Sequence, residues 1–344
     1  MNQQMVLDTF FVQAEACEAM GSPFMGVLCR AFAAHLDETT AIGHLCLNWQ
    51  GDPSPFADNV PLRLCGGLHA LVLSGCDDAL AAQYPPNTIV DWDVICRALE
   101  RHEGFLTDWM KSPPQTNEIS RSGVLWPALM HIVSVTKMPL HLLEIGASAG
   151  LNLRLDKFRY SLGDVECGEQ SSPLHLMPNW KGNAVQDQHV KILTRAGCDL
   201  NPLDPLDDQD ALRLRSYVWP DQTERLERLR QAIDIAKAHP LQIVKRDALD
   251  WLEDELMQLP VGGCTVIYST IAWQYLPQAA QEKGAAIIEA AGRRSTLENP
   301  LAWLRFEADG KSPGAGIKLL LYPQNEMVGL GRGDFHGRWV DWAV

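Results

Sequence analysis

The chain has 344 residues, of which 46% are hydrophobic and 21% are charged, so it has enough apolar material for a buried core and lacks the composition of a disordered protein. Its 43 acidic and 29 basic residues give a net charge of −14. Because nucleic-acid binding depends on clustered lysine and arginine, which this chain lacks, we expect no nucleic-acid partner. The length allows one elaborated domain or two.

The cysteines and the N-terminus indicate the compartment. Nine cysteines form no Cys-x-x-Cys motif and no pairing with histidine at metal-binding spacing, which predicts a reduced protein without a metal site. Asp8, Glu15 and Glu18 do not fit a signal peptide, and no apolar run is long enough to span a membrane. We therefore expect a cytoplasmic protein with no membrane partner, whose oligomeric state the sequence does not indicate.

Residues 1–138 have a helical pattern. Apolar residues recur at three- and four-residue intervals from Val6 to Cys17. Ser22 followed by Pro23 predicts a helix start, because the serine oxygen can accept a free N–H and proline has none to leave unsatisfied. The same periodicity from Val94 to Trp109 predicts a single long helix.

After residue 138, short apolar runs alternate with helical patterns, which is typical of a parallel sheet with crossover helices. Seven strands are predicted, over residues 140–145, 190–193, 242–244, 265–268, 302–306, 317–321 and 338–342. The glycine-rich segment between the last two has no helical pattern. We expect these two strands to form an antiparallel hairpin.

The most informative segment runs from Leu142 to Gly150. It is an apolar strand that carries Glu144 near its end and opens through small residues, Gly146 and Ser148 among them, into a helical stretch. Small residues let a ligand approach the backbone, and the N-terminus of a helix offers free N–H groups. The nicotinamide fingerprint is absent, because Ser148 and Leu151 stand where its second and third glycines would be.

This segment resembles the first motif of the class I S-adenosylmethionine-dependent methyltransferases, a strand followed by Glu/Asp-x-Gly-x-Gly-x-Gly. Glu144, Gly146 and Gly150 match this motif, and Ser148 replaces its middle glycine. The resemblance implies that these four residues bind the cofactor S-adenosylmethionine.

Two later segments resemble the next motifs of the same enzymes. Residues 196–202 include Asp199, which by this resemblance takes the ribose hydroxyls after the second strand. Residues 245–248 include Asp247, which would contact the adenine amine after the third. Each acid also has a plainer interpretation, since Asp247 in particular can cap the following helix.

The wider chain is similar to a bacterial family of unknown function, through blocks that resemble residues 115–122, 142–153, 216–222 and 273–276. This family implies no reaction. The methyltransferase motifs imply an α/β fold with a Rossmann-like seven-stranded methyltransferase-type sheet, preceded by an α-helical N-terminal region. The expected domains are residues 1–138 and 139–344, with an insertion at 157–188 that forms an extra loop or small hairpin.

Aromatic residues follow the predicted second and fourth strands. Ligands of open sheets bind beyond the carboxyl ends of the strands, so these two loops should share a crevice. Ring faces attract a sulfonium, which makes substrate-binding candidates of Tyr217, Trp219, Trp273 and Tyr275. Packing in the core is the alternative for each ring.

Polar residues before the first strand complete the predicted site. Asn117 and Arg121 are spaced to share a helix face with Glu118 and to close over the carboxylate of the cofactor, although a surface salt bridge is the simpler interpretation. Methyl transfer depends mainly on placement of the reacting groups. Where a base is needed, Glu118, Tyr268 and His336 are the candidates, and His336 can instead organise a turn.

Two other functions remain open. Gly146 to Gly150 fits the Gly-x-Ser-x-Gly pattern of a nucleophile elbow, which would make Ser148 the nucleophile of a serine hydrolase with His239 or His336 as its base. A non-catalytic ligand-binding protein is the third possibility. The acids near or after three strands favour the cofactor hypothesis, and the chain length outside the cofactor-binding fold favours a small-molecule acceptor.

Overall fold

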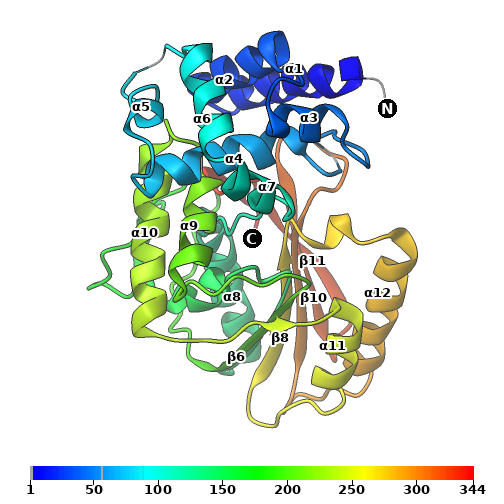
Figure 1. Ribbon diagram of the computed structural model, residues 1–344. Coiled ribbons are helices and arrows are strands. Elements are labelled where there is room, and N and C mark those ends of the chain that lie inside the picture. The colour runs from blue at the N-terminus through cyan, green and yellow to red at the C-terminus, as the bar shows by residue number, and fades with distance from the viewer. Residues whose placement is uncertain (1–2, 56, 88) are drawn as a thin grey trace. The chain divides into compact units, whose positions relative to one another are not determined.

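The computed structural model describes residues 3–55, 57–87 and 89–344 (Figure 1). The chain divides into two compact units, each described by itself. The first comprises residues 1–116 and 207–230, and the second comprises residues 117–206 and 231–344. The predicted boundary at residue 138 lies inside the second unit. Among the described residues, no helix has both the length and the apolar character needed to cross a membrane.

The first unit is built of helices, which confirms the expected helical N-terminal region. They are α1 (Gln3–Ala19), α2 (Pro23–His35), α3 (Ala41–Leu47), α4 (Val60–Leu73), α5 (Asp78–Ala81), α6 (Trp92–Arg101), α7 (Glu103–Met110), α9 (Asp208–Ser216) and the first part of α10 (Thr223–Ala238). Their apolar faces meet in one core that includes the fully buried Phe10, Phe32 and Leu64.

Two local predictions in this unit are wrong in detail. α2 begins at Pro23 as expected, but Ser22 does not cap it: the Ser22 hydroxyl donates to Asp221, whose other carboxylate oxygen accepts the Phe24 N–H at 3.0 Å. The single helix predicted from Val94 to Trp109 is broken into α6 and α7 at His102, which leaves the helical conformation while its Nε2 contacts Asp77 at 3.0 Å.

The second unit contains a large mixed sheet, so the α/β class is confirmed. Its strands, in spatial order, are β5 (Asn179–Gly182), β12 (Trp339–Trp342), β11 (Glu326–Gly333), β10 (Ala315–Tyr322), β9 (Leu301–Glu307), β8 (Cys264–Thr270), β1 (Leu140–Ile145), β6 (Ile192–Asp199) and β7 (Val244–Lys245). The sheet therefore has nine strands in the described chain, where seven were predicted.

Five neighbouring strands of this sheet are parallel. In the order β7-β6-β1-β8-β9 they are the third, second, first, fourth and fifth of these strands along the chain. This is the doubly wound order, which reverses between β1 and β8. Ligands of such sheets bind at the carboxyl ends of the strands beside that reversal, so the segment after β1 lies where a ligand is expected.

The sheet continues antiparallel beyond β9, and here one prediction is wrong. β10 pairs with β9 on one side and β11 on the other, and β12 pairs with β11, so β10 and β12 do not form the predicted hairpin. The glycine-rich segment between the two predicted strands is part of strand β11. Gly331 has φ +141°, and a Cβ there would lie 2.2 Å from the Asp341 carbonyl oxygen, so close pairing with β12 requires the glycine.

The predicted insertion holds a separate small sheet of β2 (Arg159–Leu162), β3 (Val165–Gly168) and β4 (His175–Leu176). β2 and β3 form an antiparallel hairpin, which agrees with the expectation for this segment. The strand β5 that follows does not join the small sheet but pairs with β12 at the edge of the large one.

Helices cover both faces of the large sheet (Figure 1). They are α8 (Ser122–Thr136) on one face and α11 (Ala248–Glu255) and α12 (Gln278–Gly292) on the other, and the short helices η1 (Ile119–Arg121), η2 (Leu151–Lys157) and η3 (Trp273–Tyr275) lie in the connections. Leu143 and Ile145 of β1 share an apolar core with Trp251 and Ile288 of α11 and α12. Because side chains alternate along a strand, Glu144 points to the opposite face.

Candidate functional site

The segment after β1 occupies the reversal point of the sheet. Ile145 at the end of β1 is aligned with Cys198 of β6 on one side and Ser269 of β8 on the other. Asp199 of β6 is aligned in turn with Lys245 of β7. The ends of these strands therefore meet at one edge, as the sequence predicted for the residues that follow them.

Left-handed backbone conformations shape this segment. Gly146 has φ +68°, Ser148 +53° and Gly150 +65°. A Cβ would lie 2.7 Å from the Ala272 Cβ at Gly146 and 2.5 Å from the Ile243 Cδ1 at Gly150, so both glycines are needed for the turn and for packing. Ser148 adopts the same region with a side chain, a strained state that functional sites often hold.

Glu144 is a buried carboxyl group at the end of β1. It is 1% exposed, and burial raises its pKa to about 8, with a further rise from the charge of Asp199. Tyr268, its register neighbour on β8, donates its hydroxyl to Glu144 Oε2 at 3.3 Å. Burial also holds the pKa of Tyr268 well above its usual value, so this hydroxyl keeps its proton.

The acids after the next two strands bind backbone N–H groups. Asp199 accepts the Ser148 N–H and the Asn201 N–H, both at 2.9 Å, so it ties the end of β6 to the segment after β1. Asp247 caps α11 by accepting the Leu249 N–H at 2.8 Å. The capping role considered for Asp247 is confirmed, and its exposed carboxylate remains at the same edge of the sheet.

The three polar residues before β1 also have structural partners. Asn117 accepts the Leu151 N–H at 2.8 Å at the start of η2. Glu118 is buried and accepts the Ser120 N–H at 3.1 Å, which caps η1. Arg121 donates to the Thr270 carbonyl oxygen from Nη1 and to the Phe335 carbonyl oxygen from Nε, both at 2.9 Å. They do not share the predicted helix face, because η1 begins only at Ile119.

His336 lies in the turn between β11 and β12. Asp334 organises this turn by accepting the His336 N–H at 3.0 Å and the Arg338 Nε–H at 2.8 Å. The turn packs closely on η1, since a Cβ at Gly337 would lie 2.3 Å from the Ser120 carbonyl oxygen. His336 thus belongs to the turn that contacts η1, and Glu118 directly precedes η1 in the sequence.

The predicted aromatic residues have different surroundings. Trp273 is buried in the core of the second unit, with its ring 5.3 Å from that of Trp303, so packing accounts for it. Tyr275, two residues later, is 76% exposed. Tyr217 and Trp219 belong to the first unit, so the predicted crevice shared by all four residues stays a prediction.

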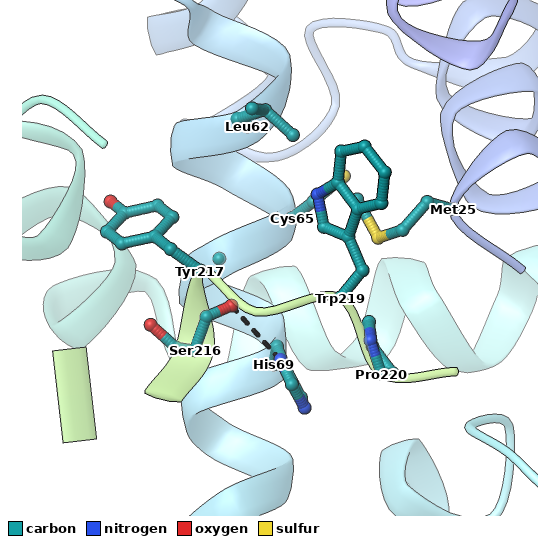
Figure 2. Close-up of a pocket in the computed structure, with 9 residues that line it drawn as sticks. Met25, Leu62, Cys65, His69, Ser216, Tyr217, Trp219 and Pro220 are labelled. Carbon is teal, nitrogen blue, oxygen red and sulfur yellow. Dashed lines mark hydrogen bonds between the residues drawn. The ribbon is translucent and has the colours of Figure 1, made fainter. Parts of the chain in front are cut away.

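In the first unit, Tyr217 and Trp219 border one cavity (Figure 2). His69 also lines it, and its Nδ1 bonds the Ser216 carbonyl oxygen at 3.0 Å, while burial lowers the pKa of His69 to about 4. The cavity measures about 10 Å³, which is room for roughly one water molecule. This volume is smaller than that of a small-molecule site, so the substrate-binding role of the two rings stays a prediction.

The geometry around Ser148 bears on the hydrolase hypothesis. Its hydroxyl is buried and has no hydrogen-bond partner in the part of the chain that the structure describes. A nucleophilic serine needs a base within hydrogen-bond reach, and neither His239 nor His336 is bonded to it. The strained turn resembles an elbow, but no histidine among the described residues is hydrogen-bonded to the Ser148 hydroxyl.

Sequence reasoning missed Glu307, which lies at the end of β9. Its buried carboxylate accepts the N–H groups of Ala272 and Trp273 at 3.1 Å and that of Gln274 at 3.4 Å. Burial raises the pKa of this group. It ties the segment after β8, where Ile271 has φ +51°, to the end of β9. An acid ending an apolar strand was the available signal.

The geometry defines an α/β protein with a polar, carboxyl-rich edge at the reversal point of a doubly wound sheet. Residues 8–342 match the model of a bacterial family described as "Uncharacterized protein conserved in bacteria (DUF2332)", and the chain belongs to this family. No curated protein matches the chain. The resemblance to a bacterial family of unknown function is confirmed, and the family name carries no reaction.

Proposed function

We propose that the second unit binds S-adenosylmethionine at the reversal point of its sheet and transfers the methyl group to a small-molecule acceptor. One observation carries the proposal: Glu144, Asp199 and Asp247 lie at or just after the ends of three adjacent parallel strands, β1, β6 and β7. The first, second and third motifs of the resemblance stand in this order.

The residues present fit a nucleoside cofactor. Each carboxylate oxygen of Asp199 accepts one backbone N–H, from Ser148 or Asn201. Each oxygen can accept a second hydrogen bond, which suits two ribose hydroxyls. Both N–H groups that Asp247 caps are bonded to Oδ1, which leaves Oδ2 to accept an adenine amine. The Ser148 hydroxyl, buried and without a partner among the described residues, adds a donor beside Asp199.

Glu144 has a different role in this proposal. Because burial raises its pKa to about 8, it is mostly protonated at neutral pH and acts as a neutral group that positions Tyr268 and the end of β1. The cofactor, when bound, supplies the activated methyl group. The residues of this chain supply orientation and exclusion of water, which are the main requirements of methyl transfer.

The sheet supports the methyltransferase type in part. Its five parallel strands have the doubly wound order, and an antiparallel strand, β10, follows the fifth. We propose that this set is the methyltransferase-type core and that β5 and the antiparallel strands after β10 extend it. Glu118 caps η1, and the turn organised by Asp334 brings the segment that carries His336 near η1. These two residues remain the proposed sources of a base for the acceptor.

Calorimetry of the whole protein tests the cofactor proposal. S-adenosylmethionine and its demethylated product should bind and NAD should not. Asp247→Asn keeps a helix cap but removes the charge, and we expect it to weaken binding about tenfold, whereas Asp250→Asn, an equal charge change one turn along α11, should leave binding unchanged. Absence of binding by both sulfur nucleosides at millimolar concentration would refute the proposal.

The same samples separate the alternatives. A fluorophosphonate that labels Ser148 would support a serine hydrolase in place of a methyltransferase. Cofactor binding without methyl transfer to any acceptor in a metabolite screen would support a non-catalytic binding protein.

A further inference from the structure

A second pocket lies in the second unit, at the start of β6 and not at its carboxyl end. It is about 530 Å³ in volume, within the usual range of small-molecule sites. The start of β6, the helix η2 and the segment before β7 surround it, and its lining includes Arg154, Lys157, Leu193, Arg195, His239 and Leu241. No step of the proposed methyl transfer uses this pocket.

The pocket is locally basic although the chain has a net charge of −14. Three of its lining side chains are cations, and the acid bonded to them is Asp156, which accepts from Arg195 Nη1 at 2.7 Å and lies 3.0 Å from Lys157 Nζ. Asp156 is bonded to Lys157 and Arg195 but not to Arg154, so the three cations are in excess over this bonded acid. The charge of Asp204 also acts on Arg154 and offsets part of this excess.

Arg154 is the most unusual of these residues. It is 1% exposed, its Nε donates to the His239 carbonyl oxygen and its Nη1 to the Gly150 carbonyl oxygen, both at 2.8 Å. Its Nη2 has no hydrogen-bond partner in the described chain. A buried guanidinium group with an unused donor and no carboxylate partner is costly, and an anion in the adjoining pocket would offset that cost.

We propose that this pocket binds the phosphate group of a small phosphorylated molecule. A phosphomonoester carries about two negative charges near neutral pH, which matches the excess positive charge of the pocket. Guanidinium and ammonium groups form charge-assisted hydrogen bonds with phosphate oxygens. The exposed side chain of Leu193 and the nearby Leu241 provide apolar surface for the organic part of the ligand.

Calorimetry with inorganic phosphate at low salt tests this proposal on the whole protein. We expect saturable binding of one phosphate, weakened about tenfold by Lys157→Gln. Lys157 is one-third exposed, so this variant should fold, which circular dichroism checks. Lys181→Gln, an equal charge change at an exposed position on β5, should leave phosphate binding unchanged.

Three results would overturn the proposal: no saturable phosphate binding at millimolar concentration, equal weakening by both variants, or tighter binding of a dicarboxylate such as malonate than of phosphate. The proposal does not rest on the cofactor site. S-adenosylmethionine binding should be unaffected by Lys157→Gln, so failure of one proposal is distinguishable from failure of the other.

Discussion

Replacement of Glu144 by glutamine should change how the stability of the second unit depends on pH. The pKa of this carboxyl is 4.5 when unfolded and is raised to about 8 when folded, because burial disfavours its charged form. Between these values the unfolded state has released the proton that the folded state keeps. Stability of the wild type therefore falls as pH rises through this window, and glutamine, which does not ionise, removes the loss.

The magnitude follows from the two pKa values. From about pH 5.5 to about pH 7.5, the wild type should lose about 2.5 kcal/mol of unfolding free energy relative to Glu144→Gln. Tyr268 can still donate its hydroxyl to the glutamine carbonyl oxygen, so the contact is kept.

Hydrogen exchange of the β1 peptide measures this difference in the unit concerned, where whole-chain unfolding would mix two units. Comparing variant and wild type at the same pH cancels the intrinsic exchange rate. The ratio of their protection factors should change about 70-fold between the two pH values. Glu282→Gln, which removes an exposed carboxylate from α12, is the control. A ratio for Glu144→Gln that stays constant with pH would refute the assignment of a neutral, buried Glu144.

Three further predictions concern the loops and the partners. Ser148→Gly should stabilise the second unit by about 1 kcal/mol, measured by the same exchange method, because glycine relieves the left-handed backbone strain. Gly146→Val should destabilise it, because the valine side chain would clash with Ala272. A loss of stability in Ser148→Gly would show that the serine side chain is needed for folding. Glu307→Ala should lower the free energy of unfolding by about 3 kcal/mol and expose residues 271–276 to limited proteolysis, because three N–H groups lose their acceptor. An unchanged cleavage pattern would contradict the anchoring role of Glu307. Filter binding with RNA and duplex DNA at low salt should show no submicromolar affinity, and tight, steeply salt-dependent binding would overturn the small-molecule acceptor.

The sequence was sufficient to locate β1 and the segment after it. Leu140 to Ile145 is a continuous apolar run apart from His141 and Glu144, and the glycines that follow are required by their own backbone angles. Local information of this kind needs no knowledge of the rest of the chain. The same holds for Asp247, whose capping role depends only on the helix it precedes.

What the sequence could not predict depends on distant partners. Strand β11 contains three glycines and has no strand-like local pattern, and it forms because β10 and β12 pair with it on both sides. Trp273 was a substrate-binding candidate with core packing as the alternative, and its ring packs against that of Trp303 from β9. The unused donor of Arg154 is visible only when its neighbours from η2, β6 and the segment before β7 are brought together.

A crystal structure of the protein with the demethylated product of S-adenosylmethionine tests whether a sulfur nucleoside binds at the reversal point of the sheet. We expect the ribose hydroxyls on Asp199 and the adenine amine on Asp247, beside the segment from Gly146 to Gly150. A nucleoside bound elsewhere in the molecule, or a fully soaked crystal with no nucleoside at this edge, would contradict a cofactor site at the reversal point.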